Sequence, residues 1–128
     1  MNVCAVNCNS LVNKLVHVYD LICRENISVL GISETWLVDG VSSSYVQLPG
    51  FNFYRGDALG SVRKHGSGLY VAESINSIQL DVELPNVTVV KLVNLNIFVI
   101  AVYRPPSYSQ EENSSLREFL LEICVGID

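Results

Sequence analysis

The stretch Ile27-Ser28-Val29-Leu30-Gly31-Ile32-Ser33-Glu34-Thr35-Trp36 decides the fold that the sequence predicts. Its apolar part, residues 27–32, has the composition of a buried strand, and Glu34 stands where that strand runs out. An unpaired carboxylate is costly to remove from water. A glutamate that closes an apolar strand therefore needs a metal ion, a basic partner or exposure to solvent, and Glu34 becomes the first candidate site residue.

A first strand and a helix precede this stretch. Residues 3–6 are short and apolar and end at Asn7, and an amphipathic helix capped by Asn9 or Ser10 follows. A strand, a helix and a second strand in this order predict two parallel strands whose carboxyl ends lie together. Asn7 and Glu34 would then meet at one edge of the sheet, where α/β folds place their sites.

The rest of the chain predicts further strands and one more helix. Turn signals separate strand-like segments at residues 51–54, 69–72, 78–84, 87–93 and 97–103, and the last three indicate an antiparallel meander. A capping box at residues 115–118 predicts the start of a second amphipathic helix, after a polar loop at residues 107–113. The predicted fold class is α/β, with a mixed, mostly antiparallel sheet and two helices.

Composition indicates a single domain with large buried faces. The 128 residues are 49% hydrophobic and 16% charged, with a net charge of −5. No apolar run is long enough to span a membrane, and no secretory signal is visible, so the four cysteines are expected to be reduced, mostly buried thiols of an intracellular protein. The acidic balance argues against a protein that coats nucleic acid, but it allows local binding of phosphate groups.

Three polar points lie at the ends of predicted strands: Asn7 with Asn9, Glu34, and Tyr103 with Arg104. A carboxylate is a hard oxygen ligand for Mg²⁺, an amide can orient it, and tyrosine and arginine can donate hydrogen bonds to a phosphate. The pattern therefore predicts a metal and phosphate site. Each residue alone also has a simpler interpretation, with Asn7 as a helix cap, Tyr103 as a core residue and Arg104 as a surface charge.

Taken together, the motifs of this chain resemble those of a known family. The segments that carry the resemblance are Asn7-Cys8-Asn9-Ser10-Leu11, Gly31-Ile32-Ser33-Glu34-Thr35-Trp36-Leu37, Gly66-Ser67-Gly68-Leu69-Tyr70-Val71 and Val102-Tyr103-Arg104-Pro105-Pro106-Ser107. In this order they resemble the endonuclease/exonuclease/phosphatase domain, and more narrowly the apurinic-type endonuclease of non-LTR retrotransposons.

This resemblance implies a four-layer, DNase I-like α/β sandwich that hydrolyses phosphodiesters of DNA with Mg²⁺ or Mn²⁺. It implies that Glu34 binds the metal, that Asn7 is an active-site asparagine and that Tyr103 contacts the phosphate. Arg104 is expected to bind phosphate or nucleic acid. Asn9 falls where many relatives have an aspartate near the metal, and an asparagine there removes a charge.

The sequence also departs from the family pattern, because neither the catalytic Gly-Asp-Phe-Asn segment nor the terminal Ser-Asp-His segment is present. Residues 1–128 are therefore expected to be the N-terminal part of the domain, a DNA-nicking endonuclease by family but inactive by themselves. The alternative is a non-catalytic retroelement remnant or binding module.

Half a sandwich would leave apolar side chains uncovered, and association through this sheet face is expected. The side chains concerned are Leu30, Ile32, Val99 and Ala101. The basic run Arg63-Lys64-His65 is either a DNA-backbone contact or simply a solvated loop.

Overall fold

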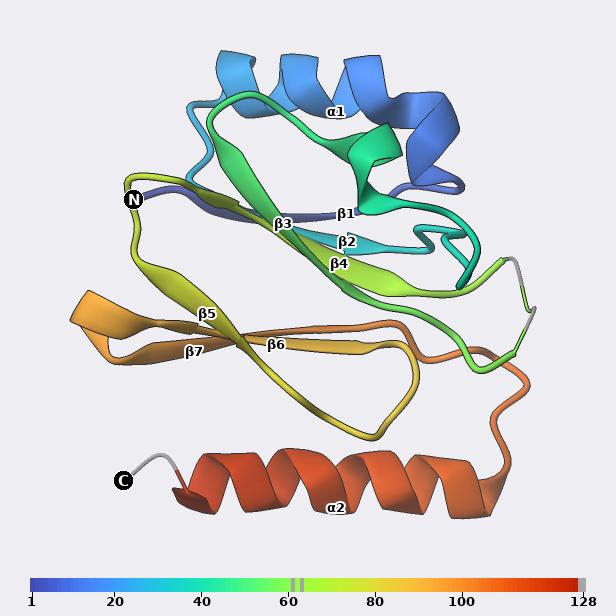
Figure 1. Ribbon diagram of the computed structural model, residues 1–128. Coiled ribbons are helices and arrows are strands. Elements are labelled where there is room, and N and C mark those ends of the chain that lie inside the picture. The colour runs from blue at the N-terminus through green and yellow to red at the C-terminus, as the bar shows by residue number, and fades with distance from the viewer. Residues whose placement is uncertain (61, 63, 127–128) are drawn as a thin grey trace.

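The chain folds into four layers. In the computed structural model, which describes residues 1–60, 62 and 64–126, helix α1 (Leu11–Arg24) covers sheet A, sheet B packs against the other face of sheet A, and helix α2 (Gln110–Gly126) covers sheet B (Figure 1). Sheet A has the order β1-β2-β4-β3 and sheet B the order β5-β6-β7. The strands are β1 Val3–Asn7, β2 Val29–Ser33, β3 Phe51–Gly56, β4 Ser67–Ala72, β5 Ser77–Leu80, β6 Val87–Leu92 and β7 Ile97–Val102. The predicted α/β class with two helices is confirmed.

The pairing of the strands fixes where their ends lie. Strands β1 and β2 are parallel, with Val3 opposite Val29 and Asn7 opposite Ser33. The other pairs, including the meander β5-β6-β7, are antiparallel. The crossover through α1 therefore brings the end of β1 beside the end of β2, as the sequence predicts.

Each space between layers holds its own apolar core, because alternate side chains of a strand point to opposite faces. Leu30 and Ile32 of β2 face α1, whereas Val29 faces sheet B. In β6, Val90 faces sheet A and Val89 faces α2. All five side chains are at most 1% exposed. Packing against both neighbours holds the two central strands in place.

The predicted exposure of one sheet face is wrong for three of its four residues. Leu30 is 0%, Ile32 1% and Ala101 9% exposed, and Val99 is half-buried. The reason is that the chain already supplies all four layers, so each face of sheet A has a cover. What stays open is the side of the sandwich along β1 and β7, where Val3 is 54% exposed.

Helix α2 begins earlier than the sequence indicates. The predicted start at Ser115 is wrong, since the helix begins at Gln110. Ser109 and Glu112 form the capping box: the Glu112 N–H donates to the Ser109 hydroxyl (3.1 Å), and the Ser109 N–H donates to Glu112 Oε1 (3.0 Å). The sequence contains two such Ser-x-x-Glu patterns, and the first one is used.

The start of α1 is fixed by the backbone of the neighbouring strand end. Ser10 occupies the predicted N-cap position, but its side chain makes no capping bond. Instead, the Leu11 N–H donates to the Thr35 carbonyl (3.0 Å) and the Ser10 N–H to the Glu34 carbonyl (3.1 Å). The helix start and the segment that follows β2 therefore hold each other in position.

Two surface expectations have different outcomes. Within the described part of the chain, no helix has the length and apolar character needed to cross a bilayer. The expectation of mostly buried thiols is wrong for Cys4 and Cys23, which are exposed, while Cys8 is buried. Cys4 lies on β1 and is exposed because β1 is an edge strand.

Candidate metal and phosphate site

Glu34 follows β2 in a strained but well-anchored backbone conformation. Its φ of 59° lies in the left-handed region, which costs a residue with a side chain about 1–2 kcal/mol. The Glu34 N–H donates to the Gly66 carbonyl (2.8 Å), and the Thr35 N–H donates to the same oxygen (3.4 Å). A disfavoured conformation held by hydrogen bonds is typical of functional positions, since it fixes the direction of one side chain.

Gly66 is the neighbour that allows this conformation. Its φ is +102°, and a Cβ placed on it would lie 2.4 Å from the Thr35 hydroxyl oxygen. A side chain at residue 66 would therefore push Thr35 away from the turn that orients Glu34. The glycine in the sequence motif thus has a local steric reason.

Asn7 contacts Glu34 directly. It is the last residue of β1, and its side-chain Nδ2 donates a hydrogen bond to Glu34 Oε2. This bond fixes one carboxylate oxygen and leaves the other free to bind a ligand. The two polar strand ends are in contact, in the arrangement that the parallel pairing predicts.

Tyr103 approaches from the other sheet. It comes directly after β7, and its N–H donates to the carbonyl of Asn86 (3.0 Å). Partial burial, and then the negative charge of Glu34, raise the pKa of the Tyr103 phenol above its usual value. The phenol is therefore protonated at neutral pH and lies within electrostatic reach of the Glu34 carboxylate.

The two remaining sequence candidates lie apart from these contacts. Arg104 is exposed, and its guanidinium donates to Asn113 Oδ1 of α2 (3.3 Å). Asn9 is also exposed, and its carbonyl accepts a hydrogen bond from Lys14 Nζ (3.3 Å). The structure thus joins Asn7 and Glu34 by a hydrogen bond and brings Tyr103 within electrostatic reach of Glu34, whereas Arg104 is turned toward α2.

Sequence reasoning missed two residues at this site. The ring of His65 lies against that of Tyr103, with centroids 5.3 Å apart. Asn86 is 2% exposed and binds the backbone of Tyr103. In the sequence, His65 is part of a basic loop and Asn86 is part of a Pro-Asn turn, so local patterns give no signal for their position beside β2 and β7.

The donor atoms fit a hard cation held largely by water and phosphate. Glu34 supplies a carboxylate oxygen, and the Asn7 amide oxygen is a second oxygen donor at the same point. Mg²⁺ prefers oxygen ligands and usually keeps several waters beside one or two carboxylates. No group of three or more His, Cys, Asp or Glu side chains that could hold a metal occurs among the described residues.

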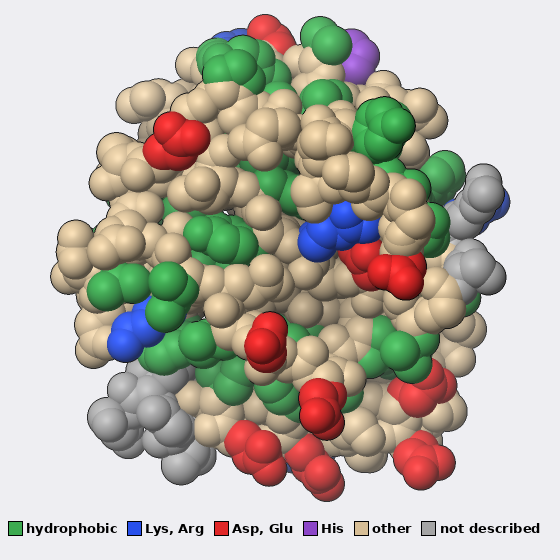
Figure 2. All heavy atoms as spheres, viewed as in Figure 1, with side chains coloured by type: hydrophobic (Ala, Val, Ile, Leu, Met, Phe, Trp, Pro, Cys, Tyr) green, Lys and Arg blue, Asp and Glu red, His purple; other side chains and the backbone are tan. Residues whose placement is uncertain are grey.

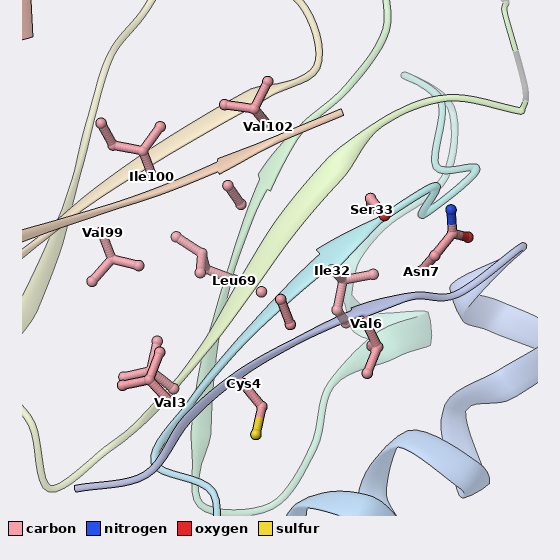
Figure 3. Close-up of a pocket in the computed structure, with 14 residues that line it drawn as sticks. Val3, Cys4, Val6, Asn7, Ile32, Ser33, Leu69, Val99, Ile100 and Val102 are labelled. Atoms are coloured by element: carbon pink, nitrogen blue, oxygen red, sulfur yellow. The ribbon is translucent and has the colours of Figure 1, made fainter. Parts of the chain in front are cut away.

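A cleft of about 680 Å³ runs from this site along the open side of the sandwich. Its walls are β1 and β2 on one side and β7 on the other, with Asn7 and Ser33 at one end and Val3 at the other (Figure 3). Apart from Asn7 and Ser33, the side chains along it are mostly apolar. The cleft is therefore polar at the end near Asn7 and Ser33 and apolar along the rest of its length.

Comparison with solved structures places the fold. An AP endonuclease from Archaeoglobus fulgidus is 17% identical, with a TM-score of 0.64 over 96% of this chain and 49% of its own. The AP endonuclease LMAP from Leishmania major is 16% identical, with a TM-score of 0.63 over 89% of this chain and 43% of its own. The 3′-5′ exonuclease NExo from Neisseria meningitidis is 19% identical, with a TM-score of 0.69 over 98% of this chain and 53% of its own.

These similarities show that the chain has a DNase I-like α/β fold, and that it spans about half the length of the structures it matches. No family model and no curated protein sequence matches the chain. The expected fold is confirmed at this level.

Proposed function

We propose that this chain carries one half of the active site of a metal-dependent DNA nuclease. The observation that carries the proposal is the hydrogen bond between Asn7 and Glu34 at the ends of two parallel strands, with Tyr103 at the end of β7 in the other sheet close enough for the charge of Glu34 to raise its pKa. The matched structures are named as AP endonucleases and as a 3′-5′ exonuclease, and NExo was also solved as a 3′ phosphatase with a product DNA hairpin. These names support DNA phosphate chemistry as the class of reaction.

Each residue has a distinct role in this proposal. Glu34 holds Mg²⁺ or Mn²⁺, and Asn7 orients the Glu34 carboxylate through its amide. Tyr103 stays protonated at neutral pH and donates its hydroxyl hydrogen to a non-bridging phosphate oxygen. When bound, the metal ion would neutralise negative charge on the phosphate. Asn9 is close enough in the chain to assist Asn7, and Arg104 would have to leave Asn113 to reach a phosphate.

Basic side chains near the site favour an approach of DNA from this end. Lys14 lies beside the turn at Asn9, and Lys64 Nζ lies 5.8 Å from the centre of the Trp36 ring. By contrast, acidic side chains gather along the lower edge of the molecule, where α2 lies (Figure 2). Arg63, a candidate DNA contact, lies outside the described residues. A phosphate backbone would therefore meet less repulsion at the site than at α2.

We further propose that residues 1–128 form the N-terminal half of the domain and bind metal and phosphate without turnover. Hydrolysis needs a group that activates water and one that supports the leaving oxygen. The Gly-Asp-Phe-Asn and Ser-Asp-His segments that would supply them do not occur in this sequence. The retrotransposon subtype is proposed from the Glu-Thr-Trp and Tyr-Arg-Pro-Pro motifs. A binding module without catalysis is the alternative, favoured because the described residues hold no group of three or more His, Cys, Asp or Glu side chains.

Metal binding tests the proposal. Titration of the chain with Mn²⁺, followed by electron paramagnetic resonance, should show one site that is weakened by the substitution Glu34→Gln. Loss of outer-shell partners typically costs about 10–100-fold in affinity, so loss of a direct ligand should cost at least that much. Glu73→Gln is the matched control, because Glu73 is exposed and follows the opposite end of β4.

The same proteins should be assayed for nicking of supercoiled plasmid. Mn²⁺ binding that does not depend on Glu34 would overturn the proposed site. Nicking by the unaltered chain that disappears in Glu34→Gln would support the nuclease and overturn the proposal that the chain is inactive alone.

A further inference from the structure

We propose that Asn86 is a positioning residue that joins the two sheets at the site, so that Glu34 and Tyr103 face the same ligand. The proposal rests on the proposed function, because it assigns a role at that same site. Asn86 immediately precedes β6 in sheet B, whereas Glu34 follows β2 in sheet A. A residue that binds both the segment holding Glu34 and the segment holding Tyr103 can set the distance between these two side chains.

Every polar group of Asn86 is used, and the four bonds reach two connections: Asp57 and Gly66 lie between β3 and β4, and Tyr103 and Tyr108 lie between β7 and α2. Its N–H donates to the Asp57 carbonyl (3.0 Å), and its carbonyl accepts from the Tyr103 N–H (3.0 Å). Its Oδ1 accepts from the Gly66 N–H (2.8 Å), and its Nδ2 donates to the Tyr108 hydroxyl (3.2 Å). With an exposed fraction of 2%, Asn86 has no solvent to replace any of these bonds.

The path from Asn86 to the site is short on both sides. On sheet B it is one hydrogen bond, from the Asn86 carbonyl to the Tyr103 backbone. On sheet A it is two hydrogen bonds, because the Gly66 N–H donates to Asn86 Oδ1 and the Gly66 carbonyl accepts from the Glu34 N–H. A shift of Asn86 would therefore move the glycine that fixes Glu34 as well as the strand end that carries Tyr103.

Asparagine meets both the backbone and the hydrogen-bonding requirements of position 86. The backbone φ of residue 86 is 62°, in the left-handed region that asparagine tolerates better than most residues with a side chain. The side chain must accept from Gly66 and donate to Tyr108, which an amide does without charge. Aspartate would keep the acceptor but lose the donor, and it would bury a negative charge on the same side as Glu34.

The test measures the electrostatic effect of the Glu34 carboxylate on the pKa of the Tyr103 phenol, which can be determined with or without a metal ion. The Tyr103 phenol pKa, followed by NMR, should fall on Glu34→Gln in the otherwise unaltered chain. In an Asn86→Gly background, which keeps the left-handed backbone but removes both side-chain bonds, this effect of Glu34→Gln should disappear. Mn²⁺ affinity should fall by about 10–100-fold in Asn86→Gly alone.

Ser67→Ala supplies the structural control. Ser67 follows Gly66 directly in the sequence. Its hydroxyl makes another buried hydrogen bond between the sheets, with the Thr88 hydroxyl (2.9 Å). This variant should lose stability, yet keep both the Glu34 effect on Tyr103 and the Mn²⁺ affinity.

The outcomes separate the two proposals. Persistence of the Glu34 effect on Tyr103 in Asn86→Gly, or its equal loss in Ser67→Ala, would overturn the role of Asn86. Absence of Mn²⁺ binding in the unaltered chain would overturn the proposed function, while the Glu34–Tyr103 measurement would still decide whether Asn86 sets their relative position.

Discussion

At the scale of single residues, hydrogen bonds from buried or half-buried side chains to backbone groups hold the loops of this fold. Arg55 is one example: its guanidinium donates to the carbonyls of Val38 (3.0 Å) and Val41 (2.6 Å) while pairing with Asp57 (2.7 Å). Tyr70 is another, because its fully buried hydroxyl donates to the Val46 carbonyl (2.5 Å). Both side chains fasten the segment after Trp36 against sheet A.

Tyr70 makes the stability of the fold sensitive to alkaline pH. Burial, and then the nearby Cys8 thiol, raise the pKa of its phenol, since ionisation would bury a charge and remove the donor to Val46. The group therefore contributes stability that is fully present below the ordinary tyrosine pKa of about 10 and is lost as the pH rises above it. The free energy of unfolding, measured by urea denaturation, should decline over that range.

Tyr70→Phe should reduce this alkaline decline, at a cost of about 1–3 kcal/mol near neutral pH for the unpaired Val46 carbonyl. Tyr45→Phe is the matched control, because Tyr45 is 66% exposed, and it should leave the decline as it is. An unchanged slope in Tyr70→Phe would show that another group causes the loss of stability.

At the scale of secondary-structure elements, the capping box of α2 gives a comparison between two serines. Ser109→Ala removes the acceptor for the Glu112 N–H and should destabilise the fold by about 1 kcal/mol. Ser115→Ala, at the start that the sequence predicts, lies inside the helix and should have little effect. Urea denaturation of both variants checks this, and a larger loss for Ser115→Ala would contradict the observed helix start.

Sequence patterns predicted the elements that are defined by local periodicity. They failed where the position of a residue depends on contacts between segments that are far apart in the chain. Strands β1, β6 and β7 and helix α1 lie close to their expected positions because apolar periodicity marks them. The meeting of Asn7 and Glu34 followed from one topological rule. The place of Asn86 could not be predicted, since its four hydrogen-bond partners are 17 to 29 residues away in the chain and lie in two separate connections, β3–β4 and β7–α2.

At the scale of the whole molecule, the open side of the sandwich is the main liability. Edge strands in natural sheets are usually protected by charges or proline. Strands β1 and β7 contain neither, and the apolar cleft lies between them. We expect the isolated chain to bind the dye ANS and to associate through this side, because exposed apolar surface and unpaired strand edges favour both.

Val3→Lys tests this expectation by placing a charge on the β1 edge. ANS fluorescence and the association seen in sedimentation velocity should both decrease. Val16→Lys is the control, because Val16 is 81% exposed on α1, away from the cleft. Equal decreases in the two variants would show that added charge, and not the β1 edge, is responsible.

The division of the site between two sheets has a consequence for how the chain folds. Sheet B is a meander of neighbours in sequence, whereas sheet A pairs β2 with β4 across an intervening strand. Short-range pairing closes small loops and long-range pairing closes large ones, so the two sheets face unequal entropic barriers. Glu34 and Tyr103 become neighbours only after both sheets have formed and packed against each other. The site is therefore expected to form in the last step of folding.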